Sequence, residues 1–378
     1  MKGFAFDLPA YVLFRIFPKK ELADSLYSAP SMGSYRFFKM GYMIKFRSVF
    51  LTALLTAGLF SNSSRAGLVV SERATLQPET VMNRTGLGVT LAVDGDRMLV
   101  GALGLPVQVL ARTGSDWSFT DEIPLPPPNP SSPGPGVNDS FGKALDLSGS
   151  FAVVAAPDAK YVGAVHVFTN AGGAWEHTQA LESPKPSPSG GFGAAVILQD
   201  RDLFVGEPGS GNVYCYQRSG GSWSLVQTIT SPAGTGSQFG AALAAEAGLL
   251  VIGAPNVNVN TWINKGKVYP YLLKNNRWVR DGALGNLHTK NRSIHEAGLT
   301  FGQAFAVGQN RLAGYGSRPG GKESIQLFVR SAKGWKREQE IVGDNAAVSN
   351  FAFYWRPPVH IALQGTVLAW SSEPSSSI

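Results

Sequence analysis

The stretch FGAALAAEAGLLVIGAP, residues 239–255, decides the fold, because close variants of it occur elsewhere in the chain. FGKALDLSGSFAVVAAP occupies residues 141–157, and FGAAVILQDRDLFVGEP occupies residues 192–208. In each copy an aromatic residue and a glycine precede an apolar hairpin, and proline follows directly after it. Self-similarity of this kind is the signature of a repeat architecture.

The apolar hairpin occurs six times, at starting points roughly 47 to 62 residues apart: Leu91, Leu145, Val196, Leu243, Phe305 and Ile361. In the first five copies an alternating strand follows, such as AVHVF at 164–168. After a short turn comes a strand that opens near a tryptophan: Trp117, Trp175, Trp223, Trp278 or Trp335. Four short strands bounded by turn-forming residues are typical of one propeller blade. We therefore predict an all-β protein, a β-propeller of about six four-stranded blades.

The sixth copy ends at Ile378 after its second strand, so the last blade is incomplete in the sequence. Residues 67–79, GLVVSERATLQPE, resemble a fourth strand and could join this blade from the N-terminal side. Two interpretations stay open. The ring has six blades with a defective last one, or the chain is a truncated fragment of a longer, seven-bladed protein.

The residue types fit packing between neighbouring blades. Gly253 and Ala254 allow close approach, and Pro255 stops the strand because it has no N–H for the ladder. The recurring Phe and Trp side chains supply large apolar areas. We expect them to form the core between blades, because in repeat proteins each unit buries its surface against its neighbours.

Residues 43–66 have the pattern of a secretory signal peptide. Lys45 and Arg47 precede an apolar run from Val49 to Phe60, and a small-residue cleavage site ends at Ala66. A membrane anchor is the alternative, but this run is shorter than the roughly 20 residues that cross a bilayer. We therefore predict an over-extended or disordered N-terminus at 1–42, a signal peptide at 43–66 and a propeller at 67–378, with no membrane span after cleavage.

The formal net charge of +7 belongs almost entirely to the leader. Residues 1–66 carry nine Lys or Arg against three Asp or Glu, which leaves the propeller region close to neutral. Nucleic acid is therefore not a predicted partner. The single cysteine, Cys215, allows no disulfide framework within the chain and takes the place of a small buried hydrophobe.

The pattern of Phe-Gly, hairpin and Gly-Ala-Pro at 253–255 resembles the FG-GAP repeat family, the integrin-alpha-like propellers. The resemblance covers 67–378 and implies a secreted or cell-surface protein of adhesion or recognition, often with calcium loops and often with seven blades. Here the first hairpins, such as Asp94-Gly95-Asp96 and Ser148-Gly149-Ser150, lack the family's Asp-rich loop. We predict no cofactor; calcium is implied by the resemblance alone.

The long connections should lie on one face of the ring, because the turns between strands 1 and 2 and strands 3 and 4 share the opposite face. Binding residues concentrate on such loops. The candidate ligand-binding residues on this face are Asn256, Asn258, Asn260, Trp262 and Arg292. The predicted partner is an extracellular protein or glycan, and the predicted location is the cell surface or the exterior, or the periplasm of a Gram-negative bacterium.

No motif predicts catalysis. The sequence has no Gly-x-Ser-x-Gly elbow, no His-Glu-x-x-His pair and no phosphate-binding loop. We predict a non-catalytic protein with no catalytic residues and no metal site. An extracellular hydrolase-associated propeller is the alternative, since propellers of the resembling family accompany catalytic domains in some proteins.

Overall fold

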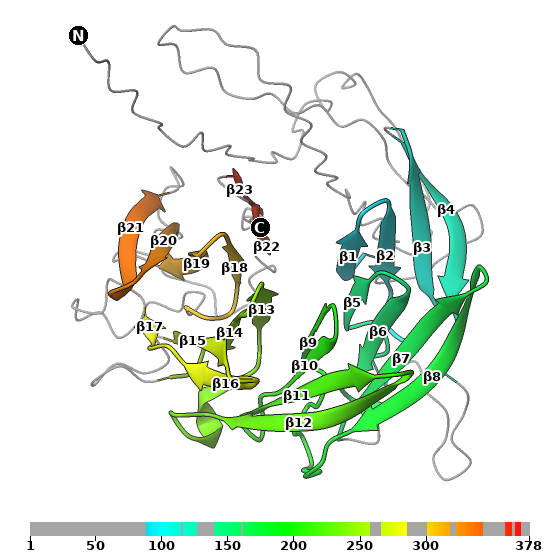
Figure 1. The fold of residues 1–378 in the computed structure, drawn as a ribbon, viewed down its shortest axis with the longest axis horizontal. Helices are drawn as coiled ribbons and strands as arrows, with labels where there is room; N and C mark the ends of the chain where they lie inside the picture. Colours follow the sequence, from blue (N-terminus) through cyan, green and yellow to red (C-terminus); the bar gives the residue numbers. More distant parts are fainter. Residues whose placement is uncertain are drawn as a thin grey trace, which may run out of the picture.

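The computed structural model describes residues 88–114, 116–126, 140–159, 162–257, 266–285, 301–317, 323–342, 360–364 and 367–371. These residues form six antiparallel sheets arranged around a common centre (Figure 1). Helical structure among them is limited to short 3-10 turns such as Thr235–Ser237. The prediction of an all-β propeller is confirmed.

Each of the first five sheets is one blade with four strands in chain order, and the sixth has two described strands. The blades and their strands are blade 1, β1 (Thr90–Asp94), β2 (Arg97–Gly101), β3 (Val107–Thr113) and β4 (Asp116–Ile123); blade 2, β5 (Ala144–Ser148), β6 (Phe151–Ala156), β7 (Ala164–Ala171) and β8 (Ala174–Glu182); blade 3, β9 (Ala195–Gln199), β10 (Asp202–Glu207), β11 (Asn212–Ser219) and β12 (Ser222–Thr230); blade 4, β13 (Leu243–Glu246), β14 (Leu249–Ala254), β15 (Lys267–Lys274) and β16 (Arg277–Arg280), with β17 (Leu284–Gly285) also paired to β15; blade 5, β18 (Phe305–Gly308), β19 (Arg311–Ser317), β20 (Glu323–Ser331) and β21 (Gly334–Val342); and blade 6, β22 (His360–Gln364) and β23 (Val367–Ser371).

The first strand of each blade lies nearest the centre, and the fourth lies outermost (Figure 1). The inner strands contact one another in chain order, from β1 through β5, β9, β13 and β18 to β22. Residues 1–87, which hold the predicted signal peptide and the segment 67–79, lie outside the described residues. The closing of the last blade by that segment therefore stays a prediction.

Blade 1 differs from the others on the side that faces away from blade 2. Leu91 and Val93 on β1 are 47% and 58% exposed, whereas Leu145 and Leu147, at the same positions of β5, are buried against blade 1. At the other end of the series, Ile361 and Leu363 of β22 pack on the core of blade 5. The described part of blade 6 therefore packs against blade 5.

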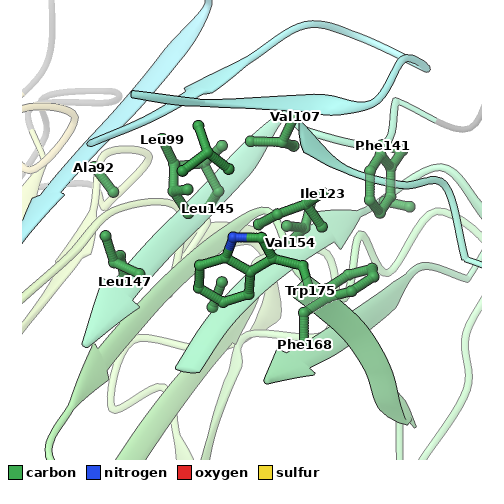
Figure 2. Packing of buried hydrophobic residues seen from close by; sticks show 13 residues of the cluster. Ala92, Leu99, Val107, Ile123, Phe141, Leu145, Leu147, Val154, Phe168 and Trp175 are labelled. Atoms are coloured by element: carbon green, nitrogen blue, oxygen red, sulfur yellow. The ribbon is translucent and has the colours of Figure 1, made fainter. Parts of the chain in front are cut away.

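The core consists of apolar clusters shared by neighbouring blades. Figure 2 shows the one between blades 1 and 2, where Leu99 and Ile123 meet Leu145, Phe168 and Trp175. Equivalent clusters join blade 2 to 3, blade 3 to 4 and blade 4 to 5. The side chains of the Phe-Gly pairs are fully buried: Phe141, Phe192, Phe239 and Phe301. The expectation that the aromatic residues form the core between blades is confirmed.

The glycine of each Phe-Gly pair occupies a conformation that other residues rarely adopt. Gly142, Gly193 and Gly240 have φ of 86°, 92° and 92°. The N–H of Gly240 donates to Gly253 O at 2.9 Å, and that of Gly193 donates to Gly206 O at 2.9 Å. The pair is therefore fixed to the end of the second strand of its own blade.

The same end of the second strand also meets the next blade. A Cβ atom added to Gly206 would overlap Gly240 O, and one added to Gly253 would overlap Gly302 O. The triplet glycine of blades 3 and 4 thus touches the Phe-Gly glycine of the following blade, whereas Ala155 stands at this position in blade 2. This contact, the glycine junction, explains why the two motifs recur together.

A second link joins the outer strands through glutamine side chains. Gln227 of blade 3 donates from Nε2 to Trp278 O (2.9 Å) and accepts the Trp278 N–H on Oε1 (2.9 Å). Gln179 of blade 2 binds the Trp223 backbone in the same two-bond manner. Each amide therefore satisfies both backbone groups of a tryptophan in the next blade, and we call this a glutamine clamp.

In blade 4 the clamp position holds Asp281, whose N–H donates to Pro270 O. Its carboxylate accepts from Arg330 Nε at 2.7 Å and from Trp335 Nε1 at 3.2 Å, both on blade 5. A charged contact replaces the amide clamp here, but it still reaches the tryptophan strand of the following blade.

Substitution of Gly253 by alanine tests the glycine junction. The new methyl group would overlap Gly302 O, so we expect the free energy of unfolding to fall by about 1 to 3 kcal/mol in urea denaturation. Gly221→Ala is the matched control, because its Cβ would meet nothing within 4 Å and its φ is not positive. Equal stability of the two variants would refute the junction.

Substitution of Gln227 by leucine tests the clamp. The Trp278 N–H and C=O lose their partners, so we expect a loss of about 1 to 2 kcal/mol in the free energy of unfolding. Gln217→Leu on the exposed face of β11 removes one solvent-exposed bond, from Gln217 Nε2 to Asp202 Oδ1, and should change it by less than about 0.5 kcal/mol. A Gln227→Leu protein as stable as the control would show that the clamp contributes nothing.

Candidate functional site

The two faces of the ring differ in the length of their connections. On one face every turn within a blade has two residues, as at 95–96, 149–150, 220–221 and 275–276. On the other face the connections between blades span residues 124–143, 183–194, 231–242, 281–304 and 343–359, and the connection from β14 to β15 spans 255–266. We call this second side the long-loop face. The strand bounds therefore confirm the predicted difference in connection length between the two faces.

Of the predicted ligand-binding residues, Asn256 is described. It lies two residues after the end of β14 on the long-loop face, is half-buried, and donates its backbone N–H to Ser237 O at 3.0 Å. Asn258, Asn260, Trp262 and Arg292 lie outside the described residues, so their role stays a prediction.

The linker 231–242 accepts the Asn256 N–H on Ser237 O, and hydrogen bonds of its own serine side chains stabilise it. Ser231 Oγ lies 2.8 Å from Ser237 Oγ, and Ser237 Oγ donates to Gly234 O at 2.6 Å. The Ser231 N–H donates to Gly211 O at 2.8 Å, in the β10–β11 loop. The backbone of this linker is therefore held in place beside blade 3 by these hydrogen bonds.

A buried carboxylate lies under the same face. Glu207 ends β10 with no exposed surface, and its Oε2 accepts from Tyr214 Oη at 2.7 Å and Ser210 Oγ at 2.5 Å. Tyr214 also lies 3.5 Å from Ser183 Oγ, in the linker from blade 2. Burial, followed by the contact with Glu207, raises the pKa of Tyr214, so its hydroxyl stays protonated and donates.

Sequence reasoning did not find this cluster. Glu207 occupies the second position of the Gly-Ala-Pro triplet, where Ala102, Ala156 and Ala254 stand in other blades. The replacement of alanine by glutamate at a packed position was the available signal.

A histidine pair on blade 2 was also missed. His166 Nδ1 and His177 Nε2 lie 3.2 Å apart on neighbouring strands, between the rings of Phe141 and Phe168. Both are half-buried, and burial lowers the pKa of His177. The two rings share a hydrogen bond and pack here as a polar extension of the core.

Cys215 is buried, as predicted, and burial raises the pKa of its thiol.

The carboxylates of the first hairpins link blades: Asp94 accepts from Gly149 N at 2.6 Å, and Glu246 accepts from Gln309 N at 2.6 Å. Within the described ranges, no group of three or more His, Cys, Asp or Glu side chains could hold a metal ion. No helix in that part of the chain is long and apolar enough to cross a bilayer.

No family model and no curated protein matches the chain. A solved structure from Bacteroides uniformis, provisionally assigned as a 6-phosphogluconolactonase, is 13% identical over 67% of this chain and 70% of its own, with a TM-score of 0.45. The β-propeller domain of Cps50 (Swd1) from Myceliophteria thermophila is 9% identical over 71% of this chain and 74% of its own, with a TM-score of 0.46. No function is carried over from either structure to this chain.

Asp146 gives the inner strands a dependence on pH. Its carboxylate accepts from Leu198 N of blade 3 at 2.7 Å and from Leu147 N at 2.9 Å. Burial raises its pKa to about 6. The two backbone N–H donors lower the pKa, but by less than burial raises it. The folded state therefore binds the proton more tightly than the unfolded chain does, and ionisation weakens the fold.

We expect stability to fall as the pH rises from about 4 to about 7, by at most about 3 kcal/mol from this group. Urea denaturation at several pH values measures the slope. The Asp146→Asn variant should show a flatter profile over that window, whereas an unchanged slope would contradict the assignment to Asp146.

Proposed function

We propose that the chain is a non-catalytic recognition module of the secreted or cell-surface kind, which binds an extracellular protein or glycan through its long-loop face. The observation that carries the proposal is the asymmetry between the faces, with uniform two-residue turns on one side and long connections on the other. A rigid scaffold that presents variable loops on one side is the usual design of a binding surface.

The links between blades supply the rigidity that this role needs. The glycine junctions hold neighbouring blades near the centre, and the glutamine clamps hold their outer strands. Loops that leave such a frame begin at fixed positions, so less freedom is lost on binding. Asn256 is one such position, fixed by its bond to Ser237 O.

Two features of the sequence support the location and the family. The leader at 43–66 has the charge and length pattern of a secretory signal. The Phe-Gly and Gly-Ala-Pro pairs resemble FG-GAP repeats, whose known members are adhesion and recognition propellers. The leader pattern and the repeat resemblance, together with the loop asymmetry, are the reasons for proposing a secreted recognition module.

The test compares two loop replacements in the full chain. In the first, residues 255–266 are replaced by the β10–β11 connection, 208–211, which joins equivalent strands of blade 3. In the second, the turn at 275–276 on the opposite face is replaced by Asn-Gly. Binding is measured on a glycan array and against fractionated surface and secreted proteins.

We expect the first replacement to lower the affinity for the captured ligand at least tenfold while the second leaves it unchanged, with both proteins folded by circular dichroism. Equal affinity in all three proteins would contradict the assignment to this face. Hydrolytic activity that is lost on substitution of a single carboxylate would contradict a non-catalytic role.

A further inference from the structure

Blades 1 and 3 have equivalent corners on the face that carries the two-residue turns, which we call the short-turn face. In blade 1 the Arg112 N–H donates to Asp96 O, and in blade 3 the Arg218 N–H donates to Arg201 O, both at 2.8 Å. Each bond joins the first hairpin of a blade to the end of its third strand. Arg112 and Arg218 also lie opposite the tryptophan of the fourth strand. The two corners therefore correspond residue by residue.

The arginine opposite this tryptophan has a carboxylate partner in two blades. In blade 1, Arg112 Nε donates to Asp96 Oδ1 at 2.7 Å, and Arg112 Nη2 lies 2.5 Å from the same oxygen. In blade 5, Arg330 Nε donates to Asp281 Oδ2 at 2.7 Å. That oxygen also accepts from Trp335 Nε1 at 3.2 Å. In both blades an aspartate thus balances the charge of the guanidinium group.

Arg218 has no such partner among the described residues. Its Nε and the neighbouring Trp223 Nε1 are buried without an acceptor, whereas its two Nη groups are not buried. Phe151 of blade 2 orients the guanidinium group, whose Cζ lies 4.1 Å from the centre of the phenyl ring. Stacking therefore fixes the group, and its outer edge is left for an acceptor that the described part of the chain does not supply.

The hairpin turn of blade 3 reverses the charge that blade 1 has at the same place. Exposed Arg201 stands where blade 1 has Asp96, so two arginines meet at a corner that holds an ion pair in blade 1. Among the nearby acids, Asp202 accepts from a glutamine of β11 at 3.0 Å. Exposed Asp200 and Glu176 form no ion pair with a described residue. No described acid therefore pairs with the guanidinium group of blade 3.

We propose that Arg218 and Arg201 bind a carboxylate of an external acidic peptide on the short-turn face. A carboxylate matches the forked edge of a guanidinium group, as the aspartate of blade 1 does. A peptide fits better than an acidic glycan because no aromatic face is open to a sugar ring. Trp223 is buried, and Arg218 lies over the ring of Phe151. The proposal does not depend on ligand binding by the long-loop face.

The test uses the full chain and a short peptide of alternating glutamate and glycine, with alternating glutamine and glycine as the uncharged control. Because an arginine at the surface binds a carboxylate weakly, binding is followed by NMR. The signal is the indole N–H of Trp223, assigned with Trp223→Phe. We expect the acidic peptide alone to shift it saturably, and less at high salt. An oligogalacturonate of equal charge should bind at least threefold more weakly.

Three variants locate the site. Arg218→Gln should weaken peptide binding at least fivefold. Arg201→Asp should weaken it at least tenfold, because the new aspartate pairs with Arg218 as in blade 1. The same variant should raise the unfolding temperature, a result that decides the question even if Arg218→Gln does not fold. Arg277→Gln, which changes an exposed arginine beside the short turn of blade 4, should alter binding by less than twofold.

Four results would overturn the proposal. They are peptide binding that Arg201→Asp leaves intact, a Trp223 signal that the acidic peptide does not move, an equal loss of binding with Arg277→Gln, and an unfolding temperature that Arg201→Asp lowers. Tighter binding of the oligogalacturonate than of the peptide would overturn the assignment to an acidic peptide.

Discussion

The contact on which the rest of the structure depends is the one between two glycines of neighbouring blades. The Phe-Gly glycine can turn the chain there because it has positive φ, and the glycine at the end of the second strand can receive its carbonyl because it has no side chain. The buried phenylalanine beside the turn then fills the core between blades. One short motif thus sets both the start of a blade and its distance from the previous blade.

Much of the fold could be predicted because these constraints are local in the sequence. Phe-Gly, the apolar hairpin and Gly-Ala-Pro stand within 17 residues, as in 239–255, and their repetition identifies the blade. The tryptophan near the start of the fourth strand was equally visible. The number of complete blades followed from counting these features, and the described residues form four four-stranded sheets, one sheet with a fifth short strand and a two-stranded sixth sheet.

The remaining contacts join residues that lie far apart in the chain. Gln227 and Trp278 are 51 positions apart, and a glutamine on an outer strand gives no local sign of its partner. The environment of Glu207 requires the linker 183–194 to fold over β10, which no pattern within either segment reveals. Asn256 was predicted from its loop alone, and nothing in that loop's own sequence indicates that its N–H donates to Ser237 O in the preceding linker.

Native-state amide hydrogen exchange tests the central role of the glycine junction most directly. The N–H groups of Gly142 and Gly240 lie at two glycine junctions, and that of Gly193 lies where Ala155 takes the place of the glycine; all three donate within their own blades. If the junctions hold the ring together, these amides exchange only through global unfolding, with the same free energy as the buried amides of β6, β10 and β14. Exchange of these glycine amides at the rate of the exposed two-residue turns would contradict the account.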